Sequence, residues 1–428
     1  MDQMIIEIKN ALEQAQVSLW SIETQTESSA ELFFIRRSLD MRRMKDTVKY
    51  NVTVYRDFEK DGKAMRGSSA VCIVPSQSAE EIHAAVEGAY FAASFVANPT
   101  YSLPEAVTAE PVVMESDLTA LTPEDAAMKM AEALFSAETG TEAVFNSVEV
   151  FGRKSQRQLL TSWGTDVGYT KYTVSGEFVV QCKQPEDVEM YHDFSYDRLD
   201  TEALKRKGSD ALRRVADRAI AKQALPSGSY DLILSEDHVA TILSYYAERT
   251  HAAMVFPGYS DWKPGSDAQG ENVTGEKLNL TLHATVPFSD EGIPMGERPL
   301  IEDGKVSLIH GSSRLCSYLG VKPTGEYRSV ICGNGTVPME QLQSRPYLYP
   351  VAFSDFQMDT MSGHFGGEIR LAYWFDGKET RIVTGGSVNG SIMDCCGKLR
   401  FSLERYSGAT YQGPLAVLMP GVPVAGTV

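Results

Sequence analysis

The histidines and carboxylates of this chain are the residue types that could take part in metal-dependent hydrolysis, and several of them lie in one segment. Residues 231–253 predict a short strand that runs into a helix carrying His238, Glu248 and His251. A hydrolytic zinc needs about three protein ligands, an open position for water and a nearby general base. At about 100° per residue, His238 and His251 lie thirteen positions apart and point to roughly opposite sides of a helix.

Glu248 and His251 do share one face of this helix, because they are three positions apart. A zinc helix usually supplies two ligands and the base from one face, since all three must point at the same ion. A lone Glu-x-x-His pair is more typical of a polar contact at the surface. The segment therefore does not predict a zinc helix.

Two residues outside this helix are weaker candidates for metal ligands. Cys396 stands in a Cys-Gly-Lys tripeptide near the carboxyl end, and His364 follows Gly363 in a predicted loop. One thiolate cannot hold a zinc ion alone. A small residue near a sheet end and a loop histidine with an ordinary hydrogen bond are the simpler interpretations. His283 and His310 lie on predicted strands and could converge with His364.

An acidic tripeptide, Asp290-Glu291-Gly292, could bind a cation or take part in acid–base chemistry. Neighbouring side chains on a strand point to opposite faces, so shared ligation by Asp290 and Glu291 is awkward. We therefore expect a turn in which one carboxylate accepts hydrogen bonds from backbone amides. Gly292 and Gly304 are expected to provide backbone freedom in turns. No nucleotide-binding glycine motif and no nucleophile-elbow motif occurs in the sequence.

The charge of the chain argues against nucleic acid and anionic membranes as partners. The 428 residues include 40 Lys and Arg against 57 Asp and Glu, which gives a formal net charge of −17. Binding to polyanions depends on clustered cations. No signal peptide and no transmembrane helix is expected from the hydropathy pattern. Six cysteines without paired spacing favour a reducing, cytoplasmic location.

The elements that position these residues differ between the two parts of the chain. Apolar residues at helical spacing predict an opening helix over 5–19, and Ser78 and Thr122 predict the caps of two more helices. A longer helix is predicted over 201–224. Short strands are predicted over 32–35, 50–55, 69–74, 148–151, 158–162, 166–174 and 177–184. After residue 225, short β-rich runs separated by turn residues dominate, with a further helix near 312–319.

These patterns predict an α+β protein. An amino-terminal half with two lobes and antiparallel sheet should be followed by a β-rich carboxy-terminal domain. The predicted boundaries are 1–110 for the first lobe, 111–225 for the central lobe and 226–428 for the carboxy-terminal domain.

Several motifs, taken in order, resemble the TldD/PmbA family. They are the strand and helix at 231–253, Ser289 to Pro294, Leu300 to Val306, and Thr360 to Phe365 including Gly363. Catalytic TldD-type members carry His-Glu-x-x-x-His on this helix, whereas this chain has Leu243-Ser244-Tyr245-Tyr246-Ala247-Glu248. The sequence therefore resembles the PmbA (TldE) arm, which lacks the motif. Cys396 lies where TldD-type enzymes place a metal-ligating cysteine.

The resemblance implies a non-catalytic subunit of a zinc metallopeptidase system that acts on unfolded peptides. It implies a TldD-like partner that carries the zinc, or self-association as a dimer, and no cofactor or catalytic residue in this chain. An autonomous metallopeptidase with an unrecognised metal site is one alternative. A homodimeric protein that binds peptides or has a structural role is another. The family's older description as modulators of DNA gyrase receives no support from the net charge of −17.

Overall fold

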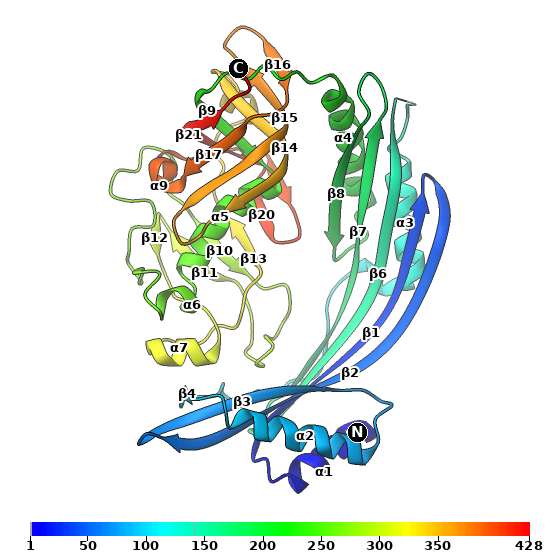
Figure 1. Cartoon of the computed structure of the whole chain (residues 1–428), viewed down its shortest axis with the longest axis vertical. Helices are drawn as coiled ribbons and strands as arrows, with labels where there is room; N and C mark the ends of the chain where they lie inside the picture. The colour runs from blue at the N-terminus through cyan, green and yellow to red at the C-terminus, as the bar shows by residue number, and fades with distance from the viewer. Residues whose placement is uncertain (1, 141) are drawn as a thin grey trace.

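The computed structural model describes residues 2–140 and 142–428, and the first half of the chain is built on one curved sheet (Figure 1). Its strands are β1 (Leu19–Ile35), β2 (Ser38–Lys60), β3 (Lys63–Ile73), β4 (Asn98–Pro99), β5 (Val112–Val113), β6 (Ala143–Thr161), β7 (Asp166–Cys182) and β8 (Val188–Tyr196). Their order is β4-β3-β2-β1-β6-β7-β5, and β8 pairs with β7. Residues of both predicted amino-terminal lobes therefore share one sheet.

The central strands of this sheet are longer than the sequence pattern predicts. β6 spans 19 residues and β7 spans 17, so the prediction of two separate strands in each of them is wrong. The reason is visible in β1, where the polar run from Glu23 to Ser28 is half-buried. Strand prediction relies on one face being apolar. That signal is absent where no helix covers the sheet.

Two helix pairs cover the same face of the sheet at its two ends. α1 (Gln3–Gln14) and α2 (Ala79–Ala93) pack at one end, and α3 (Pro123–Phe135) and α4 (Thr201–Ile220) pack at the other. Ile22 of β1 belongs to the first core, whereas Leu32 and Phe34 belong to the second. These three positions are even-numbered and therefore point to one side of β1.

The predicted helix starts in this half are confirmed. Ser78 and Glu81 form a reciprocal capping box at α2. Thr122 caps α3 by accepting from the backbone N–H of Asp125, and Pro123 occupies the first turn. Local sequence is sufficient for these features because each depends on residues within four positions.

The second half is rich in strands and contains two sheets. One has the order β12-β11-β10-β13-β20-β19, and in the other the pairing of β14 with β15 closes a ring with β9, β21 and β17. The strands are β9 (Gly228–Ser235), β10 (Leu280–His283), β11 (Arg298–Glu302), β12 (Lys305–Val306), β13 (Ser329–Cys332), β14 (Tyr347–Met358), β15 (His364–Phe375), β16 (Thr380–Val383), β17 (Ser387–Ser391), β18 (Arg400–Phe401), β19 (Arg405–Ser407), β20 (Tyr411–Pro414) and β21 (Ala416–Ala425). The predicted α+β class is confirmed.

A buried helix, α5 (Asp237–Arg249), lies in the core shared by the strands of this half. The predicted helix extends to residue 253, but the chain breaks at Thr250 and starts the short α6 (Ala252–Val255). His251 caps α6 with its ring nitrogen, which accepts from the N–H of Ala253. The predicted helix near 312–319 is present as α7 (Ser313–Leu319). No helix in the described residues is long and apolar enough to span a bilayer.

Candidate functional site

Helix α5 carries the residues that replace the zinc motif, and most of its inner face is built into the core. Leu243 and Tyr246 have no exposed surface, and Tyr245 is 4 % exposed. Glu248 is exposed and points away from this core. The position of the family's first histidine is thus an apolar contact, and the position of its second histidine faces solvent.

An aromatic cluster fills the space beside α5. The rings of Tyr245 and Tyr246 lie 5.3 Å apart, and Trp262 lies 5.8 Å from Tyr245 and 6.2 Å from Tyr246. The Arg249 guanidinium lies 5.6 Å from the centre of the Trp262 ring. The Tyr246 hydroxyl finds no hydrogen-bond partner among the described residues. Packed rings stabilise this region, but they offer no ligand set for a divalent cation.

The structure places Cys396 near this cluster, beside Tyr245 and Tyr246. Its Sγ donates a weak hydrogen bond to the Gln269 carbonyl at 3.3 Å. Burial raises the pKa of Cys396, and it raises the pKa of Cys395 to about 12. Zinc binds the thiolate, so a raised thiol pKa opposes ligation.

The turn containing Gly363 and His364 also reaches α5. Gly363 has a φ of 79°, and an added Cβ would lie 3.4 Å from the Tyr245 ring and 3.0 Å from Ile392. The exposed His364 ring lies 3.0 Å from the Ser362 hydroxyl, which in turn donates to Asp359. Gly363 therefore provides close packing, and His364 belongs to the surface hydrogen bonds of its own turn.

Gln269 connects the Cys396 loop with the Gly304 turn, and no motif or spacing in the sequence predicts this role. Its side-chain nitrogen donates a hydrogen bond of 2.8 Å to the Cys396 carbonyl, and its side-chain oxygen accepts one of 2.6 Å from the Leu278 N–H. Gly304 has a φ of 78°, and an added Cβ would lie 3.0 Å from the Gln269 oxygen. The Gly304 turn is thus positioned against the Cys396 loop by one buried amide.

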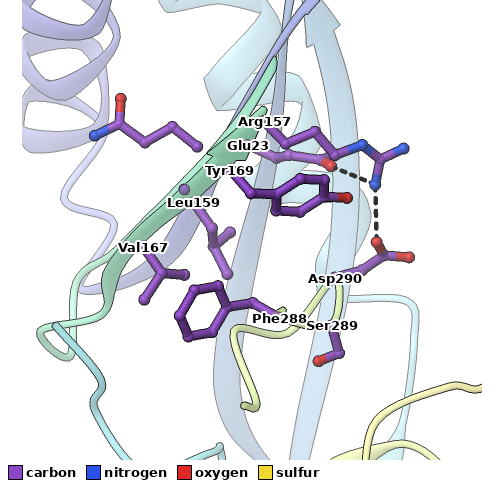
Figure 2. A pocket seen from close by; sticks show the side chains of 10 residues that line it. Glu23, Arg157, Leu159, Val167, Tyr169, Phe288, Ser289 and Asp290 are labelled. Carbon is purple, nitrogen blue, oxygen red and sulfur yellow. Dashed lines mark hydrogen bonds and ion pairs between the residues drawn. The ribbon is translucent and has the colours of Figure 1, made fainter. Parts of the chain in front are cut away.

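The acidic tripeptide lies elsewhere, at a contact between the two halves of the molecule (Figure 2). Glu291 accepts from the N–H and the hydroxyl of Ser313 at 2.9 and 3.0 Å. Burial raises the pKa of Glu291 in spite of these two donors. Gly292 has a φ of 79°, and an added Cβ would lie 2.8 Å from Thr165 in the first half.

Asp290 makes the ionic part of this contact. Its carboxylate lies 2.9 Å from Arg157, whose same nitrogen lies 3.0 Å from Glu23 (Figure 2). Tyr169 and Phe288 line a cavity of about 20 Å³ beside this pair. That volume holds about one water molecule. The tripeptide therefore docks the two halves, and the space beside it is too small for a peptide.

The remaining histidines do not converge with His364. His310 is 3 % exposed, and one of its ring nitrogens lies 2.9 Å from the Ala247 carbonyl. Burial lowers the pKa of His310 to about 4. The ring of His251 lies 4.9 Å from it, and His251 binds Glu326 at 2.6 Å. The break in the helix at Thr250 turns His251 toward this partner.

His283 makes a separate contact with Glu297 at 3.3 Å. Across residues 2–140 and 142–428, no three His, Cys, Asp or Glu side chains are placed so that they could hold one metal ion. The donors around α5 are a protonated thiol, buried phenols and an exposed carboxylate. This set does not fit the zinc site of a TldD-type enzyme.

Comparison with known families agrees with this architecture. Residues 227–426 match the PmbA/TldA metallopeptidase C-terminal domain, and residues 115–223 match the central domain of the same proteins. The chain belongs to the PmbA/TldD family. The matched central domain contains α3 and α4, and the matched C-terminal domain contains α5 and the Cys396 loop.

Three solved structures share this fold over 99 % or more of their own length. TldE from Thermococcus kodakarensis has 16 % identity and a TM-score of 0.77, with 98 % of this chain and 100 % of that chain covered. A putative modulator of DNA gyrase from Thermotoga maritima has 15 % identity and a TM-score of 0.78, with 99 % and 100 % covered. One from Bacteroides thetaiotaomicron has 15 % identity and a TM-score of 0.77, with 100 % and 99 % covered. No curated protein matches the sequence significantly.

Proposed function

We propose that this chain is the non-catalytic, PmbA/TldE-like subunit of a zinc metallopeptidase system that acts on unfolded peptides. The observation that carries the proposal is the inner face of α5, where Leu243 and Tyr246 are buried core residues. Introducing a histidine and a zinc there would require rebuilding the aromatic cluster. The chain keeps the family scaffold, and a TldD-type partner supplies the metal.

The role of this chain beside such a partner follows from the scaffold that it retains. The docked halves and the strand-rich domain can provide walls and substrate contacts around a neighbouring active site. We place the system in a reducing compartment such as the cytoplasm, because the six cysteines are free thiols. In the absence of the partner, we expect a homodimer.

The test mixes this chain with a TldD-type relative from the same organism. We expect zinc-dependent cleavage of a disordered substrate such as casein to exceed the activity of the relative alone. Replacing the glutamate of the relative's zinc motif should abolish cleavage, since that residue is the general base. Glu248→Ala in this chain should leave cleavage unchanged, because Glu248 is exposed and lies outside the core of α5.

Metal analysis separates the alternatives. About one zinc per purified chain, lost together with peptidase activity on chelation, would establish an autonomous metallopeptidase and reject the proposal. A stable homodimer that binds peptides but does not change the activity of the relative would establish the peptide-binding alternative instead.

A further inference from the structure

The outer edge of β8 has no partner strand in the described part of the chain. β7 pairs with one side of β8 from Val188 to Tyr196, and no other described strand reaches the second side. β5 pairs with the same edge of β7, but farther along, at Tyr169 and Thr170. Figure 1 shows β8 at the margin of the curved sheet, on the side toward the second half. The nine residues of β8, at about 3.3 Å each, give a free edge of about 30 Å.

Three carboxylates form a row across the strands that lead to this edge. Glu149 of β6 lies opposite Glu177 of β7, and Glu177 lies opposite Asp193 of β8. The row occupies the face of the sheet that no helix covers, because Phe178, the next residue on β7, belongs to the core shared with α3 and α4. Like charges opposite each other on neighbouring strands are destabilising. Burial, together with the charge of Glu177, raises the pKa of Glu149. A positive charge beside the row would therefore be stabilising.

The chain does not supply that positive charge itself. Elsewhere on the same sheet, Arg43 and Lys45 neutralise Glu31. Across residues 2–140 and 142–428, by contrast, no Lys or Arg forms an ion pair with a carboxylate of the row. Glu189 of β8 likewise has only a neutral partner, the side-chain amide of Asn146.

The sequence around β8 has the same charge. Residues 184–197 contain five Asp and Glu and no Lys or Arg. The two outermost carboxylates, Glu186 and Asp197, already have partners in Arg218 and Arg198. The three carboxylates between them have no cationic partner among the described residues. The free edge is therefore negative, and this charge is not cancelled within the chain.

The side chains of β8 are spaced to meet an extended chain with alternating cations. Glu189, Tyr191 and Asp193 are exposed and lie two positions apart, so they share the uncovered face. A strand added to β8 would lie about 4.8 Å away and place every second side chain beside this set. A Lys or Arg there would meet a carboxylate, then the Tyr191 ring, which is 60 % exposed, and then a second carboxylate. Cations are also attracted to the face of an aromatic ring.

Other occupants fit this edge less well. In a second copy, antiparallel pairing centred on Tyr191 would place Glu189 of one chain opposite Asp193 of the other, and like charges at that distance repel. A metal ion does not fit, because no three His, Cys, Asp or Glu side chains of the described residues could hold one. A basic chain would meet the same carboxylates with attraction.

We propose that the free edge of β8 from Val188 to Tyr196 binds an extended polypeptide segment rich in Lys and Arg by β-strand addition. The backbone of the edge would supply hydrogen bonds, and the carboxylate row would select the charge of the segment. This binding is a property of the isolated chain and needs no catalytic partner. It can therefore be tested separately from the proposed function.

The test uses the purified full chain and a fluorescent twelve-residue peptide of alternating Lys and Val. We expect saturable binding by fluorescence anisotropy at low salt, weakened by added salt because the attraction is partly ionic. Hydrogen exchange should slow at alternate amides between Val188 and Tyr196. The stretch of β2 from Ser38 to Lys49 also lacks a strand on one side and should show no change, because its cations are not matched to this peptide. The same peptide with every amide N-methylated keeps its charge but cannot donate, so it should not bind.

A charge-neutral variant locates the site. Glu149→Gln, Glu177→Gln and Asp193→Asn combined should weaken binding by about tenfold, because each exposed ion pair contributes roughly a factor of two to five. The same variant should unfold at the same temperature as the wild-type chain or higher, since the repulsion along the row is removed. Weaker binding without lower stability separates a lost contact from a damaged fold.

The matched control changes the net charge equally at a distant place. Glu13→Gln, Glu80→Gln and Glu87→Gln combined alter three exposed carboxylates of α1 and α2. This variant should change the affinity by less than twofold. An equal loss of binding in both triple variants would show that the peptide responds only to the net charge of −17, and it would overturn the proposal.

Four further results would also overturn it. They are absence of binding at low salt, binding without slowed exchange in β8, and equal binding of a peptide of alternating Glu and Val. The fourth is concentration-dependent protection of β8 without peptide, which would assign the edge to contact between copies.

Discussion

Two ionic contacts join the halves of this protein, and they differ in how far water reaches them. Arg214 of α4 binds both carboxylate oxygens of Glu236 at 2.8 and 2.9 Å, and its side chain is 10 % exposed. Arg157 of β6 reaches Asp290 at 2.9 Å, but the Asp290 side chain is 71 % exposed. Removing one residue of a buried ion pair leaves the other charge buried and unpaired. In an exposed pair, water hydrates the charge that remains. An arginine–carboxylate pair therefore contributes differently to stability at the two contacts.

The backbones at the two contacts also differ. Glu236 has a φ of 57° and a ψ of −130°, a backbone conformation that residues other than glycine rarely adopt. The backbone N–H of Glu236 donates a hydrogen bond of 2.8 Å to the Leu415 carbonyl. The Arg214 guanidinium donates two hydrogen bonds to the Glu236 carboxylate. At the exposed contact, Gly292 occupies the left-handed position without a side-chain penalty. The buried contact thus tolerates strain that the exposed contact avoids.

The largest effect is expected from Arg214→Met. The change leaves the Glu236 carboxylate without its partner, and we expect a loss of about 3 kcal/mol in the free energy of unfolding. This loss lies at the lower end of the range expected for breaking a buried ion pair, because the Glu236 side chain is 32 % exposed. Urea unfolding followed by circular dichroism measures it. The matched control is Arg213→Met, whose side chain is 55 % exposed and which should lose less than about 1 kcal/mol. Equal losses in the two variants would contradict the comparison.

The second-largest effect is expected from lowering the pH, which should destabilise the region around the buried contact. Burial lowers the pKa of His192 and of His238 to about 4, and both lie near Arg214 and Glu236. Because these values lie below the pKa of about 6.5 in the unfolded chain, the unfolded state takes up more protons as the pH falls. Stability is therefore retained above about pH 6.5 and lost toward pH 4.

We expect the wild-type chain to lose about 2 kcal/mol between pH 7.5 and pH 5 from these two histidines. The loss in the free energy of unfolding would be larger if both rings were fully buried, but both side chains are only half-buried. His238→Gln should reduce this pH dependence, whereas His364→Gln should not, because His364 is exposed. An unchanged pH dependence in His238→Gln would show that this ring is solvated in the folded protein.

Two substitutions at one position can separate strain from charge at the buried contact. Glu236→Gly loses the ion pair but relieves the backbone, whereas Glu236→Gln loses the charge and keeps the strained φ. We therefore expect the glycine variant to be more stable than the glutamine variant by about 1 kcal/mol. Thermal unfolding of the two proteins side by side measures the gap. A glutamine variant that is the more stable of the two would mean that hydrogen bonding to Arg214 outweighs the strain.

The smallest effect is expected at the exposed contact. Arg157→Met should lower the free energy of unfolding by about 0.5 kcal/mol, since both carboxylates that it faces can be hydrated. The loss should shrink further at high salt, because exposed charges are screened. Unfolding in urea at low and high salt provides the measurement. A loss as large as that of Arg214→Met would mean that Arg157 is essential for docking the halves.

Local sequence determined a large part of this protein. The caps at Ser78 and Thr122, the opening helix and the α+β class depend on residues within a few positions of one another, so periodicity and capping rules are sufficient. The absence of His-Glu-x-x-x-His at Leu243 to Glu248 is likewise readable directly, because such a motif would have a fixed spacing on one helix. Cys396 and Gly363 could be named from the same resemblance, but not their packing against Tyr245.

Tertiary structure decided the rest. The length of β6 is not visible locally, because its uncovered middle lacks an apolar face. The pairing of Arg157 with Asp290 joins residues 133 positions apart. The strained Glu236 is held by Arg214 from another element, and His251 turns to Glu326 only because the helix breaks at Thr250. These contacts depend on where the sheets and helices bring distant side chains together, and no spacing along the chain encodes that.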